Sequence, residues 1–213
     1  MSDTRSPSTA EADLAFMRAL VDGGRQPGLM AGPGASIYLV AGLLYGTQCL
    51  YHLVEFVTPI RWPQPLTTAV IVAVNLVFFS YLAIMLIRER KLRAGGSATG
   101  RALNAMFGAT GLANIGFVAI FGLNAAWRQD MSYWLLYAAA VFILQGAAWY
   151  VAYLMRRQTW MAWTGLGWFA AGTALGLILD RSIAAYLAVC AATLFLCMAL
   201  PGWIMLRRRH AQD

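Results

Sequence analysis

Three polar side chains stand in one row inside an apolar stretch of the chain: Gln48, His52 and Glu55. Their spacing of i, i+4 and i+7 places all three on one face of an α-helix. Ionisable groups in apolar surroundings are expensive, and they usually face the interior of a helix bundle or a wet cavity. An imidazole and a carboxylate one turn apart can pass protons, hold a cation or bind a polar ligand. The row is therefore the first candidate site.

A purely structural explanation of the same residues stays open. Glu55 lies near the end of the apolar stretch and would pair with Arg61, which leaves Gln48 and His52 to hydrogen-bond neighbouring helices. We expect no metal site, because His52 is the only histidine in an apolar stretch and His210 lies in the C-terminal tail. No second histidine or acid stands at ligand spacing. The histidine count also argues against haem held by two histidines, and we expect no cofactor.

Amide side chains in other apolar stretches extend the candidate site. If these stretches cross a membrane, Asn75 lies at the same depth as Gln48, while Asn114 and Gln145 lie near the midplane. Together with His52 they would line a cavity that opens outward and ends halfway through the bilayer. In the alternative, each amide joins two helices by a hydrogen bond. The expected ligand-binding residues are Gln48, His52, Glu55, Asn75, Asn114 and Gln145.

The elements that position these residues follow from the hydropathy of the chain. Its 213 residues are 60% hydrophobic and 12% charged, and the mean hydropathy is +0.60. The charged residues leave six charge-free runs of 22 to 29 residues. Apolar runs of about 18 or more residues are typical of transmembrane helices. This pattern excludes soluble, disordered, fibrous and nucleic-acid-binding proteins.

We predict an all-α, polytopic membrane protein that is a bundle of six transmembrane helices. A tail over 1–34 with a short amphipathic helix at 8–22 precedes the bundle, and a basic tail over 207–213 follows it; the alternative for 8–22 is a segment that orders only partly. Connections of two residues make the last three helices antiparallel neighbours. The predicted membrane-spanning domain is 35–206, with helices at 35–56, 66–87, 102–124, 131–155, 159–179 and 183–206.

The basic residues lie mainly on one side of this predicted topology. Of 16 lysines and arginines, 13 lie in the two tails and in the loops on the same side, and the three others are Arg61, Arg128 and Arg181. The positive-inside rule then places both termini in the cytoplasm. We expect a multi-pass protein of the cytoplasmic (inner) membrane, in contact with the lipid bilayer and with anionic lipid at its cytoplasmic face. We expect no nucleic-acid partner.

Small residues predict where the helices pack. Gly172 and Gly176 form a GxxxG pair, and Gly108 and Gly111 lie on another glycine-rich helix. Because small residues let backbones approach closely, we expect these two helices at the centre of the bundle or at a dimer contact. Pro201 removes a backbone donor from the last helix and is expected to kink it.

The sequence contains two weaker patterns, the spacing of its cysteines and a similarity between its two halves. The three cysteines, Cys49, Cys190 and Cys197, form no CxxC pair and no even spacing, so they predict neither a disulfide framework nor a zinc site. The two halves of the chain have opposite predicted orientations, as in an inverted repeat. Their similarity is limited to the triplets 43–45 and 135–137, both Leu-Leu-Tyr, and to a shared richness in glycine.

The motifs that are missing also bear on function. We find no intramembrane protease serine and histidine, no voltage-sensing row of arginines, no potassium filter, no Walker motif and no multi-histidine cluster. This argues against an enzyme, and no catalytic residue is assigned. The expected function is to bind or translocate a small molecule, ion or proton through a polar cavity. The alternatives are a non-catalytic interaction or scaffold subunit of a membrane complex, with a homo-oligomer or complex partner, and a lipid enzyme that uses Glu55.

Overall fold

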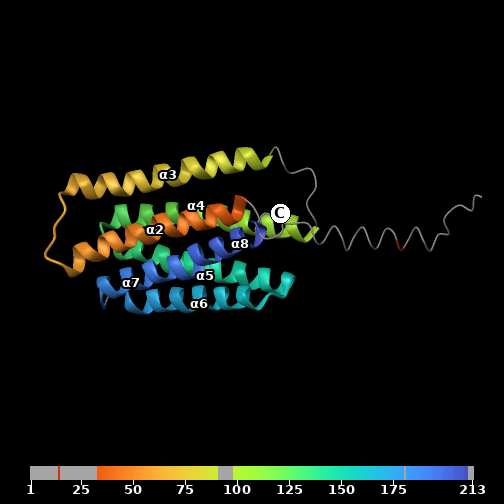
Figure 1. The fold of residues 1–213 in the computed structure, drawn as a ribbon. Coiled ribbons are helices and arrows are strands. Elements are labelled where there is room, and N and C mark those ends of the chain that lie inside the picture. Colours follow the sequence, from red (N-terminus) through yellow and green to blue (C-terminus); the bar gives the residue numbers. More distant parts are fainter. Residues whose placement is uncertain (1–13, 15–32, 91–97, 180, 211–213) are drawn as a thin grey trace, which may run out of the picture.

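The computed structural model describes residues 14, 33–90, 98–179 and 181–210, and the described chain is a bundle of helices with no β-strand (Figure 1). Six helices are long and apolar enough to cross a membrane, and each predicted span agrees with one of them to within about a turn. The predicted helix over 8–22 lies outside the described residues, except for Leu14, which is helical and exposed. The elements are α2 (Pro33–Val57), α3 (Gln64–Arg90), α4 (Ala98–Arg128), α5 (Ser132–Arg156), α6 (Thr159–Ile178), and a last helix composed of α7 (Ile183–Thr193), the π-helical segment η2 (Leu194–Ala199) and α8 (Leu200–His210).

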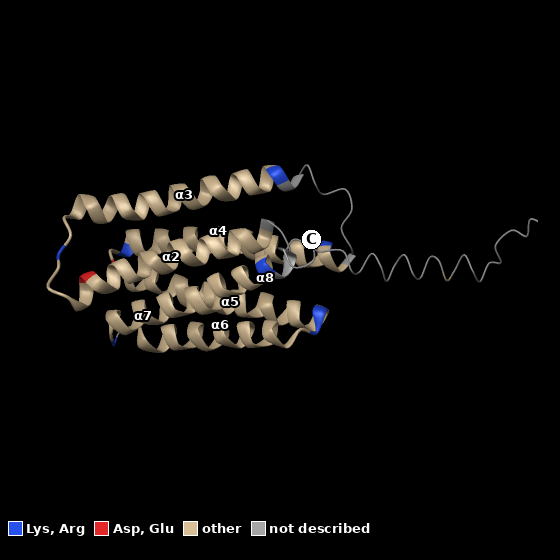
Figure 2. Ribbon diagram, in the orientation of Figure 1, with Lys and Arg blue, Asp and Glu red and all other residues tan. Residues whose placement is uncertain are grey.

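The described charged residues lie at the two ends of the bundle, and its middle carries none (Figure 2). One end, here called the Glu55 end, holds the close of α2 and the start of α3. The other, here called the Arg157 end, holds the turn between α5 and α6. This distribution matches helices whose central parts lie in apolar surroundings.

The six long helices are not equally buried in the bundle. α2 packs against α3 on one side and against α7, η2 and α8 on the other, while α5 packs against both α4 and α6. The contacts of α5 with α6 and of α6 with α7 agree with the predicted antiparallel neighbours. α3 lies at the edge of the bundle, and none of its most apolar window is buried (Figure 1). The core therefore lies between α2, α5, α6 and the last helix.

Large aromatic side chains fill that core. Trp149 is 0% exposed, and its ring lies 5.5 Å from Tyr38, 5.6 Å from Phe107 and 5.5 Å from Trp160 in edge-to-face contacts. Its indole Nε1 donates a hydrogen bond of 2.6 Å to the Tyr38 hydroxyl. This arrangement buries a large apolar surface and still satisfies the polar atom of the ring.

The closest helix contact joins α2 to the last helix. A Cβ added to Gly42 would lie 2.4 Å from the backbone nitrogen of Ala199, and one added to Gly202 would lie 2.6 Å from the backbone nitrogen of Leu39. One added to Gly46 would lie 2.9 Å from the Phe195 ring. Gly42 and Gly46 form a GxxxG pair that lets the two backbones touch. We call this contact the α2 seam.

The glycines that the sequence analysis singled out divide into two groups. Gly172 packs within the bundle, because its added Cβ would lie 2.8 Å from Cγ1 of Ile143. A Cβ added to Gly108, Gly111 or Gly176 would meet nothing within 4 Å among the residues that the structure describes. The α4 glycines therefore do not place their helix at the centre of the chain, and their role in a dimer contact stays a prediction.

The expected disturbance at Pro201 takes the form of the π-helical segment directly before it. Proline has no N–H, so the carbonyl of Cys197 four residues earlier loses its usual helical donor. Trp168, which is 1% exposed, donates its indole Nε1 to this carbonyl at 3.0 Å. A side chain of α6 thus satisfies an acceptor that the proline leaves free.

We expect Trp168→Phe to lower the free energy of unfolding by about 0.5–1.5 kcal/mol, because it removes this hydrogen bond to the part-buried Cys197 carbonyl. The measurement is unfolding by sodium dodecyl sulfate in mixed micelles, followed by circular dichroism. Trp163→Phe serves as the control, since Trp163 is 71% exposed. Equal stabilities of the two variants would show that the indole donor does not matter.

Candidate functional site

α2 carries a row of polar side chains along most of its length, which we call the polar stripe. Successive members are separated by seven, three, four and three residues, so they share one helical face. The opposite face of α2 is apolar and exposed, with Leu43 at 46% and Leu50 at 41%. The polar stripe consists of Tyr38, Tyr45, Gln48, His52 and Glu55.

His52 and Glu55 form the part of the polar stripe nearest the Glu55 end. Nδ1 of His52 lies 3.7 Å from Oε2 of Glu55, and the two side chains are 25% and 24% exposed. The pair is therefore accessible at its edge while most of each side chain is covered. Interactions between charged groups are stronger in such partly enclosed sites than in water.

Arg61 does not neutralise the Glu55 carboxylate. Its Nη1 donates instead to the backbone carbonyls of Glu55 at 2.5 Å, Thr58 at 2.7 Å and Ile60 at 3.1 Å. These contacts cap the end of α2, where backbone carbonyls lack helical donors. The predicted Glu55–Arg61 ion pair is therefore wrong, and within the described chain the basic side chain beside this carboxylate is His52, which forms an ion pair with it only when the imidazole is protonated.

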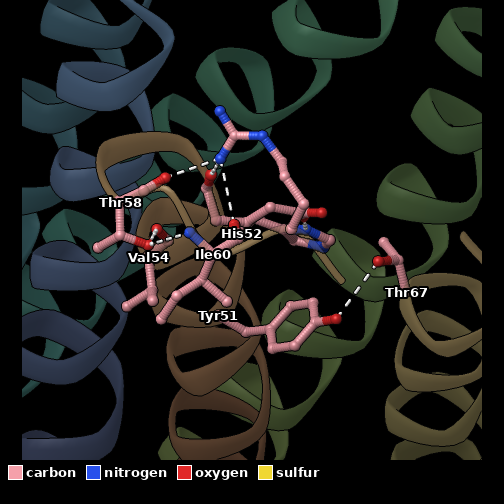
Figure 3. Close-up of polar contacts among 8 residues, drawn as sticks. Tyr51, His52, Val54, Thr58, Ile60 and Thr67 are labelled. Carbon is pink, nitrogen blue, oxygen red and sulfur yellow. Dashed lines mark hydrogen bonds and ion pairs between the residues drawn. The ribbon is translucent and has the colours of Figure 1, made fainter. Parts of the chain in front are cut away.

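The side chain of Tyr51 lies beside His52 (Figure 3). Its hydroxyl shares a hydrogen bond of 3.3 Å with Oγ1 of Thr67 on α3. Its ring stacks on Trp62 at 5.7 Å and meets the His52 ring edge-on at 5.2 Å. The start of α3 and the preceding loop thus fix the aromatic side of the site.

One turn further into the bundle, Gln48 presents an unused acceptor. Its Oε1 is buried and has no hydrogen-bond partner. Asn104 on α4 has a buried Oδ1 in the same condition. Native proteins rarely leave such atoms unpaired, so each marks a place for a water, an ion or a ligand donor.

Tyrosines from neighbouring helices bind three of the four predicted amides. Tyr45 donates to Oδ1 of Asn75 at 3.2 Å. Tyr137 donates to Oδ1 of Asn114 at 2.8 Å. These two pairs join α2 to α3 and α5 to α4.

The third pair lies deepest. The hydroxyl of Tyr38 donates to Oε1 of Gln145 at 3.2 Å and accepts the hydrogen bond from Trp149. Since Tyr38 is 7% exposed, this level of the stripe is closed by the aromatic core. Three amides are therefore joined to tyrosines between helices, as the alternative interpretation expected.

The structure thus brings together some of the predicted site residues and separates others. His52, Glu55 and Gln48 adjoin one another along α2, whereas Asn75, Asn114 and Gln145 each belong to a separate tyrosine pair. Two hollows in the described surface, of about 340 and 390 Å³, lie between α4 and α5 and between α4, α5 and α6, and other residues line them. A single cavity shared by the whole set stays a prediction.

The sequence analysis did not assign the tyrosines to the site. Tyr38 and Tyr45 stand ten and three residues before Gln48, so the same helical periodicity extends the row to them. Tyr45 and Tyr137 also end the two Leu-Leu-Tyr triplets, and both donate to an asparagine oxygen. The helical periodicity and the repeated triplets were the sequence signals that could have identified these tyrosines.

The chemistry available on the stripe is that of oxygen acceptors beside one imidazole. Carboxylate, amide and hydroxyl oxygens suit a proton or a small cation. In residues 33–90, 98–179 and 181–210, no three histidine, cysteine, aspartate or glutamate side chains gather as a metal site would require. Comparison of this chain with protein-family models, with curated proteins and with solved structures gave no match.

Proposed function

We propose that the chain is a six-span protein of the cytoplasmic membrane with both termini in the cytoplasm and the Glu55 end outside. Among the described residues, Arg61, Arg128 and Arg181 lie at the Glu55 end. The other described basic side chains lie at the opposite end: Arg88, Arg101, Arg156, Arg157 and Arg207 (Figure 2). The positive-inside rule supports this orientation. The basic end would also attract anionic lipid headgroups.

In this setting the protein binds a proton or a small cation at His52 and Glu55 and passes it along the polar stripe. The observation that carries the proposal is the 3.7 Å His52–Glu55 contact, which is partly open at the end of the stripe and next to the unpaired oxygen of Gln48. An ionisable pair that faces away from the lipid side of its helix commonly marks an ion or proton path.

The stripe offers three successive levels for such a path. At a rise of 1.5 Å per residue, His52 and Tyr45 are separated by about 10 Å along the helix axis, and so are Tyr45 and Tyr38. Tyrosine hydroxyls can both donate and accept, so they can hand on a proton when water bridges the levels. The deepest level, at Tyr38 and Gln145, must rearrange for passage because the aromatic core closes it.

We expect Glu55→Gln to lower proton flux at least about tenfold, which corresponds to about 1.4 kcal/mol in the barrier. The glutamine keeps the shape of the side chain but cannot carry the exchanging charge. The measurement uses proteoliposomes that enclose a fluorescent pH indicator, with a potassium diffusion potential as driving force. Parallel assays with sodium and rubidium identify a cation other than the proton.

Asp130→Asn is the matched control. It removes the same charge at the same end of the bundle, from a carboxylate that accepts the backbone N–H of Ser132 and lies away from the stripe. Flux should be unchanged in this variant. Wild-type flux equal to that of empty liposomes for all three ions, or undiminished flux in Glu55→Gln, would contradict the proposed function.

A second function, as an interaction subunit, is favoured by the open glycines of α4. A Cβ added to Gly108, Gly111 or Gly116 would meet no atom of the described residues within 4 Å, so another helix could approach closely here. If this face is an interface, Gly111→Leu should dissociate an oligomer or complex in mild detergent, as measured by light scattering. A mass equal to one chain plus detergent in the wild type would exclude self-association.

A further inference from the structure

The larger of the two hollows opens sideways between α4, α5 and α6, in the part of the bundle nearest the Glu55 end. Its volume is about 390 Å³, within the range of small-molecule sites, which is about 300–1,000 Å³. Apart from one threonine, the residues that line it are apolar or glycine. They include Phe121 on α4, Ala140 and Ile143 on α5, and Gly176 and Leu177 on α6.

Two glycines one turn apart on α6 create this hollow. A Cβ added to Gly172 would lie 2.8 Å from Cγ1 of Ile143 and 3.0 Å from the carbonyl oxygen of Ala139, so this glycine brings α6 against α5. A Cβ added to Gly176 would meet nothing within 4 Å among the described residues. The two helices therefore touch at Gly172, and one turn nearer the Glu55 end the absent side chain of Gly176 leaves space beside α5.

The depth of the hollow matches the hydrocarbon of one membrane leaflet. Leu136, which also lines it, and Ile143 lie four and eleven residues after the start of α5. At 1.5 Å per residue they are roughly 6 and 17 Å below the Glu55 end, and half of the bilayer hydrocarbon is about 15 Å thick. Leu136, Ile143 and Leu177 are 36%, 44% and 69% exposed, so the hollow is open on its outer side. An acyl chain fits this lining better than water, which would find few polar partners.

A cation stands at the mouth of the hollow. Arg128 lies seven residues after Phe121 on α4, hence on the same face and two turns nearer the Glu55 end. Its guanidinium lies 5.1 Å from the centre of the Tyr133 ring. Tyr133 in turn stands seven residues before Ala140 on the same face of α5. The cation–π contact therefore holds a positive charge above the apolar lining, at the depth of lipid headgroups.

The guanidinium of Arg128 is suited to a phosphate. Asp130, the acidic residue of the same turn, uses its carboxylate to accept the backbone N–H of Ser132 at 2.9 Å. Arginine has five N–H donors in a planar fork, and it binds the oxygens of a phosphate in pairs. A guanidinium that lies against an aromatic ring can still present its outer N–H groups to such a ligand.

We propose that this hollow binds one acyl chain of an anionic phospholipid whose phosphate pairs with Arg128. The apolar lining selects the chain, and the arginine selects the negatively charged headgroup. The site lies between α4, α5 and α6, whereas the polar stripe lies on α2, so lipid binding does not depend on the proposed ion path.

The test uses the full-length protein in nanodiscs of phosphatidylcholine with a small fraction of phosphatidylglycerol that carries a diazirine in one acyl chain. After illumination and proteolysis, mass spectrometry locates the labels. We expect them at Phe121, Ile143 and Leu177 rather than at Leu76 and Val77, which are exposed on α3. Phosphatidylcholine with the same diazirine chain should label the hollow about fivefold less, because one basic residue distinguishes the two headgroups.

Gly176→Leu tests the hollow itself. The new side chain occupies the free space, so the labels in the hollow should be lost while the circular dichroism spectrum stays that of the wild type. Gly108→Leu is the matched control, because it makes the same change at an open glycine of α4 nearer the Arg157 end. This control should keep the labels.

Charge variants test the headgroup. Arg128→Gln should remove the fivefold preference for phosphatidylglycerol, whereas Arg61→Gln, which removes the same charge at the same end from the loop after α2, should keep it. Glu55→Gln should be labelled like the wild type, so failure of the proposed ion path leaves this result intact. Labels spread evenly over α3 and the hollow, unchanged labels in Gly176→Leu, or equal yields from the two lipids would overturn the proposal.

Discussion

Gly42→Leu is expected to abolish the folded bundle. Even the first carbon of a side chain at this position would lie 2.4 Å from the backbone nitrogen of Ala199 and 2.8 Å from the carbonyl oxygen of Leu194. Backbone atoms of a packed helix cannot move aside as the end of a flexible side chain can. Overpacking of a close contact typically costs about 1–3 kcal/mol, and a leucine against two backbone atoms exceeds that range.

The size series at Gly42 makes the prediction quantitative. Gly42→Ala should lower the free energy of unfolding by about 2–3 kcal/mol, measured by sodium dodecyl sulfate titration in mixed micelles. Gly108→Ala is the control, because its new methyl group meets nothing within 4 Å and alanine favours helix by up to about 1 kcal/mol. If the two alanine variants unfold at the same detergent fraction, the α2 seam is not the close contact described.

The second large effect is expected at the centre of the aromatic core. Trp149→Ala should lower the free energy of unfolding by about 3–5 kcal/mol, since it removes a fully buried ring and leaves a cavity. It also deprives the Tyr38 hydroxyl of its 2.6 Å hydrogen bond, so the deepest level of the polar stripe loses its support. The measurement is thermal and detergent unfolding followed by far-ultraviolet circular dichroism.

A control at a second tryptophan distinguishes the effect of removing a buried ring from the effect of removing any tryptophan. Trp163→Ala removes the same side chain from a position that is 71% exposed. We expect its unfolding transition to stay within about 0.5 kcal/mol of the wild type, as is usual for surface changes. If Trp163→Ala lowered the free energy of unfolding as much as Trp149→Ala does, the burial of the ring would not determine the size of the effect.

The helices of this protein could be predicted from the sequence because charges interrupt the apolar runs. Each run between charged residues is long enough for one membrane-spanning helix, and the short connections, down to two residues between α5 and α6, leave little freedom for the boundaries. The position of Arg157 shows this locally, since it ends α5 in a left-handed conformation and its backbone N–H bonds the carbonyl of Tyr153. Such short-range signals depend only on neighbouring residues.

Packing faces could not be predicted in the same way. Gly42 and Gly46 form a GxxxG pair, as Gly172 and Gly176 do. Yet a Cβ added to Gly176 would meet nothing within 4 Å in the described chain, while one added to Gly42 would touch the backbone of the last helix. In an apolar environment the outer and inner faces of a helix have similar composition, so hydropathy does not separate them. The choice depends on how the partner helix is shaped, here by the π-helical segment before Pro201.

The candidate site could be predicted only in part from the sequence, for a related reason. The row from Gln48 to Glu55 follows from periodicity, whereas the donors that occupy Asn75, Asn114 and Gln145 lie 23 to 107 residues away in the chain. From the sequence, Arg61 was predicted to pair with the Glu55 carboxylate, because this acidic group is nearby in the chain. In three dimensions the free carbonyls at the end of α2 compete for the same guanidinium.

The most direct test of the polar stripe is the reactivity of single cysteines on α2 toward a charged methanethiosulfonate reagent. Gln48→Cys and Leu50→Cys are compared in proteoliposomes, in a background with Cys49→Ser, Cys190→Ser and Cys197→Ser. The two positions differ by only two residues in depth, but Leu50 is 41% exposed on the apolar face. We predict that Gln48→Cys reacts at least about tenfold faster and that its modification blocks proton flux. Equally slow reaction at both positions, or flux that persists after modification of Gln48→Cys, would contradict a path along the stripe.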